Sequence, residues 1–160
     1  MKKHLFLAVA LIATCLGFSS CSDDNDLPNV DFTVDFEGGV VDPSTGTIYV
    51  VQGDELEVTS ITVHNLDSDK NAGITGVQYY WDYNLIGISP VAPFGFSIAT
   101  SEDTAIGTHA LSIQAGVVAV DKEPAFAVLE YPVEVVASPE DIPVTDTTGT
   151  LTTNQTLTGV

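Results

Sequence analysis

The stretch VDFTVDFE, residues 30–37, alternates apolar and polar side chains without a fault. Val30, Phe32, Val34 and Phe36 fall on one face of an extended chain, and acidic or hydroxyl side chains fall on the other. Side chains on a strand point alternately to opposite faces. The stretch therefore predicts a half-buried strand with one solvated side.

The following hundred residues continue in the same manner, with short strand-like segments separated by turn signals such as DPSTG at 42–46. With the first strand, the expected segments are 47–52, 56–64, 77–83, 85–89, 93–100, 108–120 and 125–136. Seven or eight strands at this spacing are typical of a sandwich, and no segment after the leader has a sustained helical period. We expect an all-β fold, an antiparallel β-sandwich over residues 30–137.

Three details of these segments carry local predictions. The apolar parity shifts near Thr59 and Ser60, which predicts a bulge or a switch of sheets. Pro132 favours an edge, a strand end or a bulge, because proline cannot donate to a ladder. In VQYYWDY, alternation from Val77 places Tyr79, Trp81 and Tyr83 on one face, most of them in the core, with Tyr80 on the other face.

Residues 1–20 have the parts of a secretory signal: two lysines, an apolar stretch from Leu5 to Leu16, and small residues. An apolar stretch of about 12 residues is too short for a bilayer core, which needs roughly 20. The expected organisation is a signal peptide at 1–20, an acidic tether at 21–29, the sandwich at 30–137 and a Thr-rich tail or linker at 138–160. The end of the tail, GTLTTNQTLTGV, is also compatible with a strand.

The letters FSSC before and including Cys21 resemble the lipobox of bacterial lipoproteins, although Phe18 replaces the usual leucine. This resemblance implies acylation of Cys21 and anchoring in a membrane lipid; the alternative is a secreted protein with a free thiol. Ser22, Asp23, Asp24 and Asp26 resemble the export signal of Bacteroidetes surface lipoproteins. They imply a place on the outer membrane, facing the exterior, and they also suit an extended tether.

Trp81 in a mid-domain strand, AIGTHALSIQA at 105–115 and the final YPVEVV at 131–136 resemble the immunoglobulin-like modules of such lipoproteins. The resemblance implies an immunoglobulin-like sandwich over 30–137. The paired core cysteines of antibody domains are missing, and His109 stands where a tyrosine-corner residue often sits.

The composition excludes several classes of function. The chain has 4 Lys+Arg against 22 Asp+Glu, a net charge of −18, and no arginine. Such a chain cannot neutralise a row of phosphates, so nucleic-acid binding is excluded. With Cys15 in the leader and Cys21 acylated, the sandwich has no thiol for a disulfide, a metal or catalysis.

The sequence gives no support for an enzyme. His64 and His109 lie in different expected strands without metal-ligand spacing, and we expect both to be structural. No nucleophile elbow or phosphate-binding loop occurs. The many carboxylates are better explained as solvated faces of an acidic sandwich than as a glycosidase pair.

Asp67, Asp69 and Asn71 follow a D-x-D-x-N pattern, a spacing that lets a loop wrap oxygens around Ca²⁺. In an EF-hand loop that began at Asp67, the glycine would stand at position 72, but it stands at 73. The twelfth position, which should be a glutamate, is Gln78, so an EF-hand is rejected. A looser calcium site is the candidate cofactor site, and an ordinary polar loop is the alternative.

The remaining candidates concern ligands and modification. Tyr80, between Gln78 and Asp82, is a candidate for stacking against a sugar ring, and equally an ordinary surface residue. Thr104 and Thr147 fit a short O-glycosylation motif of the same bacteria. The expected function is a non-catalytic surface module that binds a glycan or a protein, as in adhesion. The alternative is a structural subunit of an envelope or pilus-like assembly, completed by strand exchange through the tail.

Overall fold

The computed structural model describes residues 27–67, 71–143, 150–154 and 158–159, and residues 1–26 lie outside them. The elements are β1 (Val30–Glu37), β2 (Val40–Val41), β3 (Ile48–Val51), β4 (Glu55–Asn65), β5 (Ala72–Trp81), β6 (Asn84–Ser89), β7 (Phe96–Ala99), β8 (Gly107–Ala119), β9 (Ala125–Val136), a 3-10 turn η2 (Pro139–Asp141), β10 (Thr150–Asn154) and β11 (Thr158–Gly159). All eight expected strands are present; β2 is an addition, and β10 and β11 lie in the tail, whose end the sequence left compatible with a strand.

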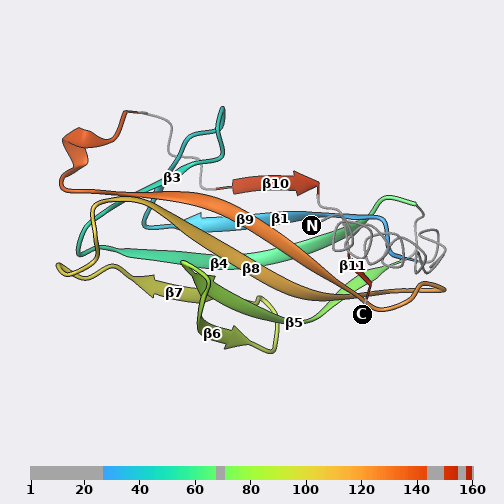
Figure 1. The fold of residues 1–160 in the computed structure, drawn as a ribbon. Helices are drawn as coiled ribbons and strands as arrows, with labels where there is room; N and C mark the ends of the chain where they lie inside the picture. Colours follow the sequence, from blue (N-terminus) through green and yellow to red (C-terminus); the bar gives the residue numbers. More distant parts are fainter. Residues whose placement is uncertain (1–26, 68–70, 144–149, 155–157, 160) are drawn as a thin grey trace, which may run out of the picture.

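Two sheets form a β-sandwich (Figure 1). The four-stranded sheet has the order β10-β1-β4-β7, and the larger sheet has the order β2-β3-β9-β8-β5-β6, with β11 added to β9. The prediction of an all-β sandwich is confirmed. The order also matches the immunoglobulin-like arrangement, since β1, β4 and β7 take the places of strands A, B and E, and β9, β8 and β5 those of G, F and C.

One pairing departs from the expected antiparallel pattern. β3 pairs with β9 in parallel, with Ile48 opposite Val133 and Val51 opposite Val136. The chain leaves the four-stranded sheet after β1 and joins the edge of the other sheet through β2 and β3. It therefore meets the last long strand in the same direction.

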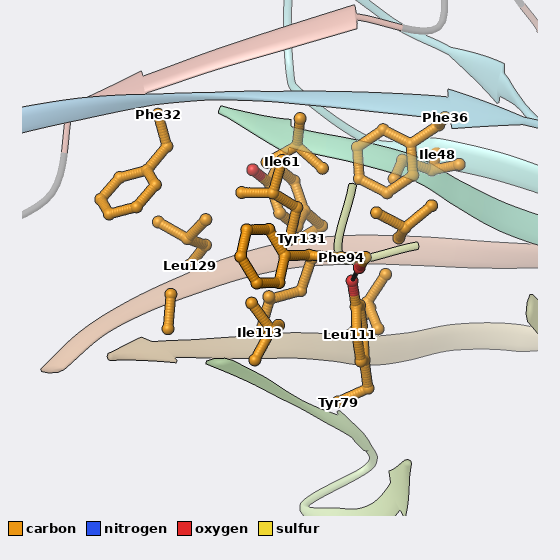
Figure 2. Packing of buried hydrophobic residues seen from close by; sticks show 14 of the residues in the cluster. Phe32, Phe36, Ile48, Ile61, Tyr79, Phe94, Leu111, Ile113, Leu129 and Tyr131 are labelled. Atoms are coloured by element: carbon orange, nitrogen blue, oxygen red, sulfur yellow. Dashed lines mark hydrogen bonds between the residues drawn. The ribbon is translucent and has the colours of Figure 1, made fainter. Parts of the chain in front are cut away.

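The core lies between the two sheets and is made by the alternating residues that the sequence indicates (Figure 2). In β1 the four apolar residues are at most 5% exposed, whereas the intervening residues are partly exposed. The ring of Tyr79 stacks on Phe96 with 4.9 Å between centroids, and its hydroxyl donates to the carbonyl of Phe94. The core thus joins β5 of one sheet to β7 of the other.

The predicted irregularity in β4 is a bulge. Asp35 pairs with Ser60 and Phe36 pairs with Val58, so Thr59 has no opposite residue in β1. This extra residue lets Val58 and Ile61 both point into the core.

Pro132 lies where proline costs no ladder hydrogen bond. Its partner in β8 is Ala110, whose N–H donates to Asp82 Oδ1 and whose carbonyl accepts from Asp82 N–H. Ala110 thus turns its polar groups away from β9, so the nitrogen of Pro132 faces the other edge of β9. The pairing with β3 begins only at Val133. β9 is an interior strand of its sheet, and Pro132 lies at a position of it that β3 does not pair, which is one of the places the sequence indicated.

The prediction that the strand runs on to Tyr83 is wrong. β5 ends at Trp81, and Asp82 and Tyr83 form the turn into β6 with positive φ values of 47° and 67°. Two consecutive positive φ values suit the right-handed twist of a hairpin. Tyr83 is therefore 83% exposed at the tip, while Tyr79 is fully buried.

The sandwich continues beyond the expected limits of residues 30–137. Leu27 packs against the core from the end of the tether. β10 pairs with β1 from Asp31 to Asp35, and β11 pairs with β9 at Phe126 and Ala125. In the described part, the end of the tail thus adds a strand to each sheet. No helix in this part is long and apolar enough to cross a membrane.

Candidate functional site: the outer face of the larger sheet

The solvent side of strands β6, β5, β8 and β9, here called the outer face, is built from cross-strand neighbours. One row runs Ile88, Gln78, Gln114, Val128, and the next runs Leu85, Tyr80, Ser112, Glu130. Opposite residues of an antiparallel pair share a face and lie about 5 Å apart. The register therefore assembles four separate segments of sequence into one continuous surface.

Tyr80 lies within this surface and is partly exposed, as the alternation predicts. Its hydroxyl donates to Oε1 of Gln78 at 2.6 Å and lies 3.4 Å from Oε1 of Gln114. The two amides come from neighbouring strands, β5 and β8. The ring is thus held by one hydrogen bond, and the amide nitrogens of both glutamines are donors available beside it.

A hollow of about 280 Å³ adjoins Gln78 and Gln114 on this face. It exists because Gly76 of β5 lies opposite Gly116 of β8, so two neighbouring positions carry no side chain. A Cβ on Gly116 would lie 2.4 Å from Oγ1 of Thr75. Ile88 and Phe126 line the hollow on its two sides.

The outer face differs in charge from the rest of the molecule. In the two rows named above, Glu130 is the one residue that is charged at neutral pH, whereas Leu85 and Ile88 are 53% and 59% exposed. The solvent side of the four-stranded sheet carries Asp35, Glu37 and Glu57 at adjacent positions. A contiguous surface of apolar and amide groups on a strongly acidic protein is typical of a contact site.

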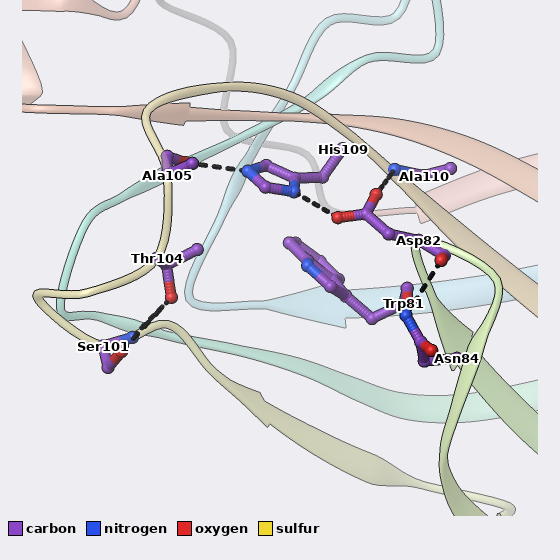
Figure 3. A network of polar contacts seen from close by, with 8 residues as sticks. All are labelled: Trp81, Asp82, Asn84, Ser101, Thr104, Ala105, His109 and Ala110. Atoms are coloured by element: carbon purple, nitrogen blue, oxygen red, sulfur yellow. Dashed lines mark hydrogen bonds and ion pairs between the residues drawn. The ribbon is translucent and has the colours of Figure 1, made fainter.

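At the β5–β6 turn, His109 forms the second feature with chemical character (Figure 3). Its Nδ1 lies 2.7 Å from Oδ2 of Asp82, and its Nε2 lies 2.7 Å from the carbonyl oxygen of Ala105. The ring stacks on Trp81 with 5.0 Å between centroids. Both partners accept hydrogen bonds, so this geometry suits an imidazolium that donates from both nitrogens.

The ionisation of this pair follows from its contacts. Burial on its own would lower the pKa of His109, but the hydrogen bonds to Asp82 and Ala105, with the charge of Asp82, raise it above the usual value. Burial would raise the pKa of Asp82, but the N–H of Ala110 and the bond and charge of His109 lower it. The pair is therefore a charged clamp between the turn and the start of β8.

The clamp does not have the arrangement of a catalytic base. A histidine base needs one free ring nitrogen near a nucleophile, and both nitrogens of His109 are engaged. Among the residues that the structure describes, no three His, Cys, Asp or Glu side chains gather as a metal site. The expectation that His109 is structural agrees with this geometry.

The other residues singled out from the sequence lie partly inside and partly outside the residues that the structure describes. Oδ1 of Asp67 accepts a hydrogen bond from Asn29 at 2.7 Å, Asn71 is exposed, and Asp69 lies outside the described residues, so the calcium site stays a prediction. The hydroxyl of Thr104 accepts from the N–H of Ser101 at 2.9 Å within a turn. Thr147 and the residues of the expected tether, Cys21, Ser22, Asp23, Asp24 and Asp26, also lie outside the described residues.

Comparison with known proteins finds matches among solved structures. A solved structure of the fibronectin(III)-like modules of CbhA from Clostridium thermocellum is 19% identical to this chain, with a TM-score of 0.37, over 62% of this chain and 94% of that one. No family model and no curated protein matches the sequence.

Sequence reasoning identified Tyr80 but missed its surroundings. Gln114 and Phe126 lie 34 and more residues further along, and only the register of β8 with β5 and β9 brings them beside Tyr80. The glycines in GITG and QAGV, residues 73–76 and 114–117, were the available signal for a hollow, since a glycine within a strand often marks a close approach.

Proposed function

We propose that this chain is a non-catalytic binding module, held by acylated Cys21 on the exterior of an outer membrane, that binds a neutral glycan on the outer face. The observation that carries the proposal is the uncharged surface around Tyr80 on a protein of net charge −18. Acidic ligands such as nucleic acids or uronic-acid chains would be repelled by this protein.

The chemistry of the outer face suits a sugar chain. A sugar ring offers an apolar face of C–H groups and a rim of hydroxyls. Tyr80, Ile88 and Phe126 supply apolar surface, and the amides of Gln78 and Gln114 supply donors and acceptors at its centre. The four strands make a continuous support, which suits a chain that lies across several of them.

The anchoring is consistent with such a role. Two or more acyl chains hold a protein firmly, because each buried methylene contributes about 0.8 kcal/mol. The tether reaches the sandwich at Leu27, just before β1. β1, which continues the tether, belongs to the smaller sheet. The outer face belongs to the larger sheet, so it lies in the layer opposite the point of attachment.

The test is calorimetry of residues 22–160 against soluble neutral polysaccharides, with the variants Tyr80→Ala and Gln114→Ala. We expect Tyr80→Ala to weaken binding about tenfold or more, because its ring would be the stacking platform. The matched control is Tyr49→Ala on β3, which removes a tyrosine from the same sheet on the far side of β9. Equal binding by Tyr80→Ala and the native protein would contradict the proposal.

A second candidate is a structural subunit that exchanges its tail strand with a neighbour. The pairing of β10 with β1 favours it, because β10 follows a connection of several residues and completes an edge that another copy could also complete. Gel filtration of the chain with and without residues 138–160 tests it. Strand exchange predicts larger species only with the tail, whereas a monomer in both forms would contradict it.

A further inference from the structure

The free side of β7 is an unoccupied strand position. β7 is the last strand of its sheet, and beyond it the described part of the chain supplies no partner. In constant-type immunoglobulin domains a further strand, D, lies beside the strand at this place. In the opposite sheet β6 extends alongside (Figure 1), and the ring of Phe96 lies against Gly87.

The backbone of β7 presents hydrogen-bonding groups to this free side. The N–H of Thr100 donates to the carbonyl of Asp54, so Thr100 directs its backbone groups toward the β4 side. Successive residues of a strand alternate in this respect. Ile98 and Phe96 therefore also face β4, while Ser97 and Ala99 turn their N–H and C=O groups outward.

A cavity of about 280 Å³ adjoins the same edge. Trp81 of β5, Ile86 of β6 and Ile98 of β7 supply its apolar walls. Two hydroxyls of its lining have partners: Oγ1 of Thr100 donates to the carbonyl of Asp54, and Oγ1 of Thr104 accepts from Ser101. The volume is below the roughly 300–1,000 Å³ of pockets for drug-sized ligands, so it suits an anchoring apolar side chain.

The charges around this edge specify the partner further. Residues 84–101 contain no charged side chain, so the edge itself does not repel a charged partner of either sign. Beside it, Glu55 and Glu57 of β4 are exposed opposite Ala99 and Ser97, and Glu37 of β1 is directly opposite Glu57. Like charges directly opposite each other destabilise a sheet, and β1, β4 and β7 contain no lysine.

We propose that the free edge of β7 binds an extended cationic segment of a partner protein, which adds as a further strand. Its apolar side chains would enter the cavity beside Trp81, and its alternating lysines would lie on the solvent side. A strand added to β7 lies two strand spacings, about 10 Å, from β4, within reach of long lysine side chains. This site differs from the outer face in location and in ligand class.

The test uses the single tryptophan of the chain, Trp81, as the reporter, because it lines the cavity. Residues 22–160 are titrated with a capped nine-residue peptide of alternating lysine and valine, at peptide concentrations below its own association. We expect a saturable shift in emission, weakened by salt. A peptide with glutamate for each lysine, and one with the lysines and valines in two blocks, should not bind.

Two variants locate the interaction. Ala99→Pro removes an outward N–H without removing a bond to β4, and we expect about tenfold weaker binding. Glu55→Gln with Glu57→Gln should weaken binding similarly, whereas the control Glu123→Gln with Glu140→Gln removes the same charge elsewhere and should leave it nearly unchanged. Equal effects of both charge pairs would overturn the proposal, as would equal binding of the glutamate peptide. A self-association that Ala99→Pro abolishes would assign the edge to a second copy instead.

Discussion

His109 holds the corner at which the chain enters β8. In immunoglobulin-like domains a tyrosine near the start of strand F bonds to backbone a few residues upstream. Here the Nε2 of His109 contacts the carbonyl of Ala105, four residues upstream, while Nδ1 contacts Asp82 in the turn between β5 and β6. The imidazole therefore joins two loops where a phenol would join one.

The stability of the protein should depend on pH through this clamp. The raised pKa of His109 means that its contribution is present in full below about pH 6.5, the usual value, and is lost as pH rises through the folded-state value. The lowered pKa of Asp82 means that its contribution is present above about pH 3.8 and is lost below the folded-state value. The clamp should thus act most strongly between these limits.

Urea unfolding of the native protein and of His109→Gln from pH 4.5 to 9 measures this effect. We expect the variant to be less stable by about 1–2 kcal/mol near pH 5, the net value of one or two lost hydrogen bonds to charged groups. The difference should shrink as pH rises through the folded-state pKa of His109. A difference that stays constant up to pH 9 would show that His109 contributes through packing alone.

At the scale of elements, the two sheets are joined at one side by β6 and β7. Gly87 of β6 carries no side chain, and the ring of Phe96 fills that space while it stacks on Tyr79 at an interplanar angle of 17°. A Cβ on Gly87 would lie 2.0 Å from Cε2 of Phe96. The contact between the sheets at this side therefore requires glycine at position 87.

Gly87→Ala should lower the free energy of unfolding by about 1–3 kcal/mol, because the ring of Phe96 must leave its stacked position. Gly73→Ala in β5 is the matched control, since its Cβ would meet only Val118 at 3.7 Å. Denaturant unfolding of both variants decides the matter. A loss of similar size in both would attribute the effect to glycine replacement in a strand, not to the ring.

The elements were predictable where a single strand carries its own signal. The alternation of apolar and polar residues predicted β1 and β9. The shift in which residues of β4 are apolar predicted the bulge at Thr59. The turn at Asp82 and Tyr83 was not predictable, because Tyr83 stands at the second position, where such a turn usually takes glycine. The parallel pairing of β3 and the hollow beside Gln114 depend on contacts between distant segments, which local patterns do not encode.

At the scale of the molecule, charge is distributed unevenly over the sandwich. Asp35, Glu37 and Glu57 adjoin on the smaller sheet, whereas the outer face around Tyr80 is nearly free of charge. The net charge of −18 keeps the protein soluble and repels anionic surfaces, so a lipid anchor would have to supply the attachment. On such a protein, the nearly uncharged outer face is the area where carboxylates repel a ligand least.

Changing Cys21 to Ser should therefore move the protein from the membrane fraction to the soluble fraction, or leave an uncleaved precursor. Cell fractionation with protease treatment of intact cells measures both location and exposure. As a control, Asp23, Asp24 and Asp26 changed together to Ala should leave the protein acylated but protected from external protease. Normal processing and membrane location of the Cys21→Ser protein would refute the anchoring.

The most direct test of the binding proposal is a map of backbone amide shifts in isotopically labelled residues 22–160 on addition of a neutral polysaccharide. The proposal predicts shifts that cluster at Gln78, Tyr80, Ile88, Gln114 and Phe126, across four strands that only the fold brings together. Shifts concentrated on β1 and β4, or on the β5–β6 turn without the outer face, would contradict it.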